Sequence, residues 1–140
     1  MNIELHKDDH KILSYHHDQN NLILGSSGEW ILNDSGYQEF KPGFERRFSL
    51  SSFGHNTLIL NKCGQIYKKG YITNHKFDEE IDYISGDASK CYSIKTGLRK
   101  FQRTLFFVKP NIIFVMDEVK FNKTSNLVES LWHTNNKTRI

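Results

Sequence analysis

The chain has 140 residues, of which 37% are hydrophobic and 25% charged, so it can bury a core and is not disordered by composition. Its net charge of +3 is spread out, without the dense basic cluster of a nucleic-acid arm or a polybasic membrane anchor. No run reaches the roughly 18 apolar residues of a membrane helix. The first residues lack the pattern of a signal peptide, which leaves the compartment unknown. We therefore predict one domain over residues 1–140, with no nucleic-acid or membrane partner.

Strand signals dominate, and the first in chain order is a hairpin. Residues 21–24 and 29–32 are mostly apolar and flank the Gly/Ser turn at 25–28, a pattern typical of two antiparallel strands. Further strands, each bounded by turn residues, are predicted at 57–60, 81–84, 101–108, 112–117 and 127–133. The two runs separated at Lys109-Pro110-Asn111 indicate a second hairpin.

Helix signals are weak, because no long segment keeps the 3.6-residue apolar period. Residues 38–52 include Pro42 and Gly43 and show no clean period, which predicts a surface loop. Many short strands with turns between them predict an all-β fold, an antiparallel β-sandwich. Cys63 and Cys91 form no disulfide framework and are expected to be free thiols.

Three polar residues lie at the ends of predicted strands. His16 precedes the first strand, Asp34 follows the second, and His55 precedes the third. If the first two strands form a hairpin, His16 and Asp34 lie at the same end, where His55 could join them. Two imidazole nitrogens and a carboxylate oxygen suit zinc. The neighbouring Asp18 or Gln19 could hold a ligand imidazole in its correct tautomer.

A structural explanation of these residues stays open. The chain has seven histidines, so a chance trio of two histidines and an aspartate is easy to assemble. The histidines outside the trio are expected to be surface or hydrogen-bonded structural residues: His6, His10, His17, His75 and His133.

Several blocks of the sequence resemble, in order, motifs of heparinase II/III-like polysaccharide lyases and oligoalginate lyases. They are HHDQNNL at 16–22, DSGY at 34–37, HNTLILN at 55–61 with Gly64-Gln65, GDASKCY at 86–92, and the segment from Arg103 to Glu118, with Trp132-His133 as a looser match. In that family an α-helical toroid precedes an antiparallel β-sheet domain of the supersandwich type. The resemblance implies that this chain is the C-terminal sheet domain, a fragment of a longer protein whose toroid is absent.

The resemblance also implies a structural zinc ion held by His16, Asp34 and His55. It further implies β-elimination on uronic-acid glycans such as heparin, heparan sulfate or alginate. In that reaction a base removes the proton α to the carboxylate and an acid protonates the leaving glycosidic oxygen. The implied partners are an acidic polysaccharide and an upstream or separate α-toroid.

The sequence departs from the family pattern at the catalytic residues. Ser14 stands where many members carry a further histidine, and the absent toroid supplies a catalytic tyrosine in the family. We therefore assign no catalytic residue and expect the isolated chain to be weak or inactive, although His10 or His17 could substitute in space.

A second hypothesis is a non-catalytic glycan-binding or structural β-sandwich module. Under the lyase hypothesis, Tyr37, Arg46 and Arg47 are candidates to contact a sugar or its carboxylate. The alternative for these three is a packed tyrosine and two solvated arginines.

Overall fold

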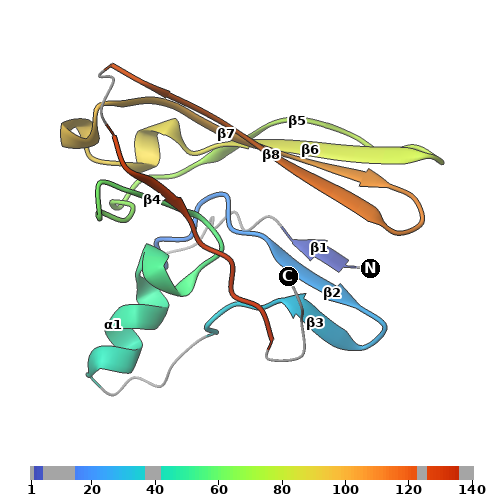
Figure 1. Cartoon of the computed structure of the whole chain (residues 1–140), viewed down its shortest axis with the longest axis horizontal. Helices are drawn as coiled ribbons and strands as arrows, with labels where there is room; N and C mark the ends of the chain where they lie inside the picture. The colour runs from blue at the N-terminus through green and yellow to red at the C-terminus, as the bar shows by residue number, and fades with distance from the viewer. Residues whose placement is uncertain (1, 5–14, 37–41, 123–125, 136–140) are drawn as a thin grey trace.

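The computed structural model describes residues 2–4, 15–36, 42–122 and 126–135, and most elements in it are strands (Figure 1). The strands form three antiparallel sheets: β1 (Asn2–Glu4), β2 (Ile23–Ser26) and β3 (Glu29–Leu32); β4 (Leu58–Leu60) and β9 (Val128–Ser130); and β5 (Tyr71–Lys76), β6 (Ile81–Asp87), β7 (Leu98–Val108) and β8 (Ile112–Phe121). In Figure 1 the four-stranded sheet and the β1–β3 sheet form two layers, with β4 between them. The predicted all-β antiparallel architecture is confirmed.

Both predicted hairpins are present. The turn between β2 and β3 is formed by Ser27 and Gly28, whose φ values of 53° and 79° are both positive. Two positive φ values define the turn type that matches the twist of paired strands. The β7–β8 hairpin pairs from Leu98 opposite Phe121 to Val108 opposite Ile112, so it forms the long axis of the larger sheet.

Three features of the local structure differ from the expectations. The predicted loop at 38–52 contains the helix α1 (Phe44–Leu50), which has seven residues and is therefore too short to show a clear apolar period. β5 was not predicted, because all six of its residues are exposed on an edge strand and the sequence YITNHK shows no alternation. β6 continues to Asp87 rather than ending at Ile84, since it is paired on both sides there.

The core lies where β4 packs against the larger sheet. Leu58 and Leu60 of β4 contact Phe101 of β7 in a buried cluster that also contains Cys91 and Tyr92. Alternate residues of a strand point to opposite faces, which turns the side chains at 101, 103 and 105 of β7 inward together.

The two cysteines are free thiols, as predicted, with Cys63 exposed and Cys91 buried. Within the described ranges, no helix combines the length and the apolar character that a membrane span requires.

Candidate metal centre

The first side of the site is the loop that precedes β2. The backbone N–H of His17 donates to the carbonyl of Leu50 at the end of α1, at 2.9 Å. The side chain of Gln65 both accepts from the Gln19 N–H and donates to the Gln19 carbonyl, each at 2.8 Å. These contacts come from residues distant in sequence, so the loop that carries His16 and Asp18 is held by the fold.

The second side of the site is the residue pair His55-Asn56, which precedes β4. The Asn56 amide nitrogen donates to the carbonyls of Leu22 and Asn33, at 2.8 and 2.7 Å. Its backbone N–H donates to the side chain of Asn21 at 2.8 Å. Asn56 thus ties the base of the β2–β3 hairpin to His55, whose side chain is 1% exposed.

The structure brings the three predicted ligand residues together. His16 Nδ1 lies 3.3 Å from His55 Nε2. The other nitrogen of His55, Nδ1, lies 2.8 Å from Asp34 Oδ2, which also accepts a hydrogen bond of 2.6 Å from the Asn21 amide. The residues whose ligand atoms all lie within 4.8 Å of one another are His16, Asp18 and His55, a group that has Asp18 in the place expected for Asp34.

The spacing of the two imidazole nitrogens fits a metal ion. Zinc binds histidine nitrogen at about 2.0–2.1 Å, so two nitrogens at the tetrahedral angle are about 3.3 Å apart. This equals the 3.3 Å between His16 Nδ1 and His55 Nε2. The contact of Asp34 with His55 Nδ1 is the usual arrangement by which a carboxylate fixes the tautomer of a ligand histidine.

Hydrogen bonds keep Asp34 ionised. Burial by itself would raise the pKa of Asp34, but the hydrogen bonds from His55, Gly36 and Asn21 outweigh burial and hold that pKa below its ordinary value. A charged Asp34 favours the proton of His55 on Nδ1 and leaves the Nε2 lone pair facing His16.

A buried arginine supports both sides of the site from beneath. Arg103 is 0% exposed, and its Nη1 donates to the carbonyls of Asn20 and Asn56 at 2.8 and 2.5 Å. Its Nε and Nη2 each donate to the carboxylate of Asp117 at 2.7 Å. The sequence marked Arg103 only as part of a motif. The one available signal for its partner was the carboxylate of Asp117, which lies opposite Arg103 on β8.

The remaining predicted residues lie elsewhere. Arg46 and Arg47 are on α1, half-buried and exposed respectively, and Tyr37 and Ser14 lie outside the described residues, as do His6 and His10. His133 contacts the side chain of Asn56, which agrees with the structural role expected for it. His75 lies on the exposed strand β5.

His17 differs from the other histidines. Its Nδ1 is buried without a hydrogen-bond partner, and its ring meets Tyr15 edge-on with centroids 5.4 Å apart. Burial lowers the pKa of His17, so this imidazole is neutral near pH 7.

The fold and the histidine–aspartate cluster define an antiparallel β-sheet domain with a candidate metal centre. A family model of the heparinase II/III-like C-terminal domain matches residues 7–140, so the chain belongs to this polysaccharide lyase family. A solved structure titled as a heparinase III gene product with methylated lysines has the same fold, with a TM-score of 0.65 and 20% sequence identity over 76% of this chain. The match covers 16% of that larger protein. Curated protein sequences show no match.

Proposed function

We propose that this chain is the zinc-binding β-sheet domain of a polysaccharide lyase that acts on uronic-acid glycans. The observation that carries the proposal is the facing pair of His16 Nδ1 and His55 Nε2 at 3.3 Å, with Asp34 on the far nitrogen of His55. The site connects loops from three parts of the chain, which suits an ion that fixes loop positions.

Two carboxylates are candidates for the third ligand. Asp34 is the residue expected from the family motif, whereas Asp18 offers an oxygen in the same group as the facing nitrogens. A ligand carboxylate binds the ion directly, and an orienting carboxylate acts through His55 at a cost of about 10–100-fold in metal affinity when removed. Comparison of Asp18→Asn with Asp34→Asn by competition with a zinc chelator separates the two roles.

In the proposed reaction the substrate loses the proton α to its carboxylate, a C–O bond to the leaving sugar breaks and a C=C bond forms. The leaving oxygen takes a proton from an acid, so the charges balance. The site loop carries an imidazole next to a phenol, His17 and Tyr15 with ring centroids 5.4 Å apart, but the Tyr15 hydroxyl donates to the Lys68 carbonyl. We therefore expect the isolated chain to bind zinc and to have little or no lyase activity, with an α-toroid supplying the missing groups.

The test measures zinc and product separately. Metal analysis of the chain after zinc loading and dialysis should give about one zinc per chain. His16→Gln and His55→Gln should abolish binding, whereas His75→Gln, on the exposed strand β5, should leave it unchanged. A zinc content below about a tenth of an ion per chain would refute the metal site.

Activity is followed as absorbance of the unsaturated product with heparin, heparan sulfate and alginate. Robust turnover by the isolated chain would refute the requirement for a second domain. Glycan binding without turnover, even when an α-toroid from a related enzyme is added, would favour the alternative of a non-catalytic binding module.

A further inference from the structure

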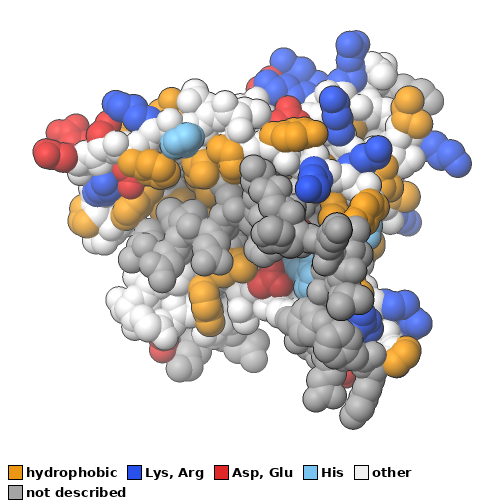
Figure 2. All heavy atoms as spheres, turned by 180° about the vertical axis from the view of Figure 1, so that it is seen from behind, with side chains coloured by type: hydrophobic (Ala, Val, Ile, Leu, Met, Phe, Trp, Pro, Cys, Tyr) orange, Lys and Arg blue, Asp and Glu red, His pale blue; other side chains and the backbone are white. Residues whose placement is uncertain are grey.

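A basic pocket lies at one end of the larger sheet, outside the candidate metal centre. It has a volume of ≈ 710 Å³, and its lining includes four cationic side chains and one carboxylate. The cationic residues are Lys69, Lys90, Arg99 and Lys100. Figure 2 shows lysine and arginine side chains gathered at the upper right, and aspartate and glutamate at the opposite end of the same sheet.

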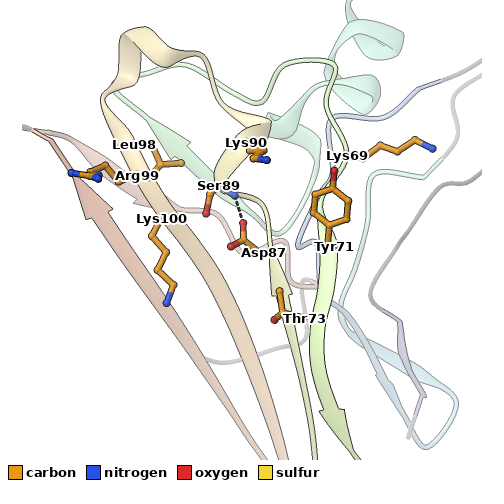
Figure 3. Close-up of a pocket in the computed structure, with 9 residues that line it drawn as sticks. All are labelled: Lys69, Tyr71, Thr73, Asp87, Ser89, Lys90, Leu98, Arg99 and Lys100. Carbon is orange, nitrogen blue, oxygen red and sulfur yellow. Dashed lines mark hydrogen bonds between the residues drawn. The ribbon is translucent and has the colours of Figure 1, made fainter.

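The pocket combines these cations with an exposed aromatic ring. Tyr71 begins the edge strand β5 and is 57% exposed. Figure 3 shows the Tyr71 ring and the Lys100 side chain on either side of Asp87, while Lys69 and Arg99 extend from opposite ends of the pocket. β5 and β7 flank β6, so the ring and the Lys100 strand are about 10 Å apart.

Within the described part of the chain, some charged side chains of the pocket have a hydrogen-bond or ion-pair partner, and others do not. The carboxylate of Asp87 accepts a hydrogen bond of 2.8 Å from the Ser89 N–H, and Lys100 forms an ion pair with Glu118. Neither Lys90 nor Arg99 has an ion-pair partner among the residues that the structure describes. The pocket therefore presents two uncompensated cations beside an accessible tyrosine.

The pocket is joined to the metal-site loop by one short segment. The Lys68 carbonyl accepts a hydrogen bond of 2.5 Å from Tyr15, and the Gly70 N–H donates to the side chain of Gln19 at 2.7 Å. Tyr67 at the start of this segment is 53% exposed and packs on Tyr15 with ring centroids 4.1 Å apart. Residues 67–71 thus form an aromatic and basic surface that runs from the site loop to the pocket.

We infer that this pocket is a subsite for an anionic sugar unit of the glycan, apart from the reacting sugar. The tyrosine ring provides an apolar platform for the C–H face of a sugar, and Lys90 and Arg99 provide cations for the carboxylate or sulfate groups that the glycan presents across the pocket. The inference rests on the proposed function for the identity of the occupant. A nucleic acid is the other polyanion with this chemistry, but the family and the absence of a dense basic block favour a glycan.

The experiment measures binding of the chain to heparin oligosaccharides and to oligoalginate by calorimetry at low salt. The pocket variant is Lys90→Gln with Arg99→Gln, and the charge-matched control is Lys62→Gln with Lys76→Gln, two exposed lysines outside the pocket. We expect the pocket variant to bind about tenfold more weakly and the control to change less than about twofold. Tyr71→Ala should weaken binding with the salt dependence unchanged, because it removes no charge.

Binding of heparin alone would identify sulfate as the recognised group, and binding of both glycans would show that carboxylate suffices. An equal loss of glycan affinity in the pocket variant and in the control would overturn the inference. It would also be overturned if the chain bound neither glycan, or if it bound single-stranded DNA more tightly than either glycan. Zinc content is measured on the same samples. A chain that binds zinc but loses no glycan affinity in the pocket variant would refute the subsite and leave the metal proposal intact.

Discussion

The most informative perturbation is the removal of the buried guanidinium of Arg103. This side chain makes two hydrogen bonds to Asp117 and two to the carbonyls of Asn20 and Asn56. Arg103→Met keeps much of the volume and removes all four bonds. Two backbone carbonyls then lose their donor, and the carboxylate of Asp117 loses its counterion.

The expected cost follows from the burial of the two partners. Removal of one partner from a buried ion pair costs about 3–5 kcal/mol. The side chain of Asp117 is 19% exposed and so keeps some contact with water, which places the expected loss near the lower end, about 3 kcal/mol. A domain of this size has a free energy of unfolding of about 5–15 kcal/mol, so the variant should remain folded but much weakened.

Urea unfolding followed by circular dichroism measures this change. With a slope of about 2 kcal/mol per molar urea, the midpoint should fall by about 1.5 M. Lys100→Met is the matched control, because Lys100 also pairs with an acidic residue of β8 but at the surface. That variant should change the midpoint little, since exposed ion pairs contribute little to stability.

Two results would contradict this reasoning. The first is a midpoint shift below about 0.5 M for Arg103→Met, which would mean that water replaces the lost bonds. The second concerns Arg103→Met combined with Asp117→Leu, which removes both charges and should recover part of the loss. A double variant less stable than Arg103→Met would show that Asp117 is not the residue left unsatisfied.

Two further predictions concern packing and pH. Gly54→Ala should destabilise the domain by about 1–3 kcal/mol and weaken zinc binding, because a Cβ at this position would lie 2.7 Å from Ser35 Oγ. The control is Gly43→Ala, where a Cβ would have no atom within 4 Å, and it should change neither urea unfolding nor zinc content. Equal effects of the two substitutions would refute the packing argument. Burial raises the pKa values of Cys91 and Tyr92 to about 12 in the folded chain. As the pH rises, the unfolded chain therefore loses these two protons before the folded chain does. The free energy of unfolding should consequently fall between about pH 9 and pH 12. Urea midpoints at about pH 8 and about pH 11 measure this fall in stability. Tyr92→Phe should make the difference between the two midpoints smaller. If that difference is unchanged in the variant, Tyr92 does not contribute to the pH dependence.

The sequence by itself determined the strands that are marked by apolar residues and bounded by turn residues. The β2–β3 and β7–β8 hairpins were predictable because two apolar runs flank a short group of turn residues in each. The elements that were not predicted, β5 and α1, lack such local signals. β5 buries neither face and so carries no alternating pattern, and α1 is too short for a helical period to appear.

The candidate site was predictable to the level of residue types. His16, Asp34 and His55 stood at strand ends and matched a family motif, and these three side chains do lie together. The sequence did not show that Asp34 contacts Nδ1 of His55, or that Asp18 offers an oxygen within 4.8 Å of ligand nitrogens of His16 and His55. Those details depend on rotamers and on hydrogen bonds between segments far apart in the sequence, which no local pattern records.

Only the tertiary structure decided the role of Arg103 and the location of the basic pocket. The Arg103 guanidinium bonds to a carbonyl 83 residues away, and the pocket gathers side chains from β5, β6 and β7, from Lys69 before β5, and from Ser89 and Lys90 after β6. Burial and the convergence of charges arise when distant segments pack, whereas strand periodicity is set by each residue and its immediate neighbours. For that reason the sequence specified the elements and the family of this protein, while the packing of the sheets placed its charges.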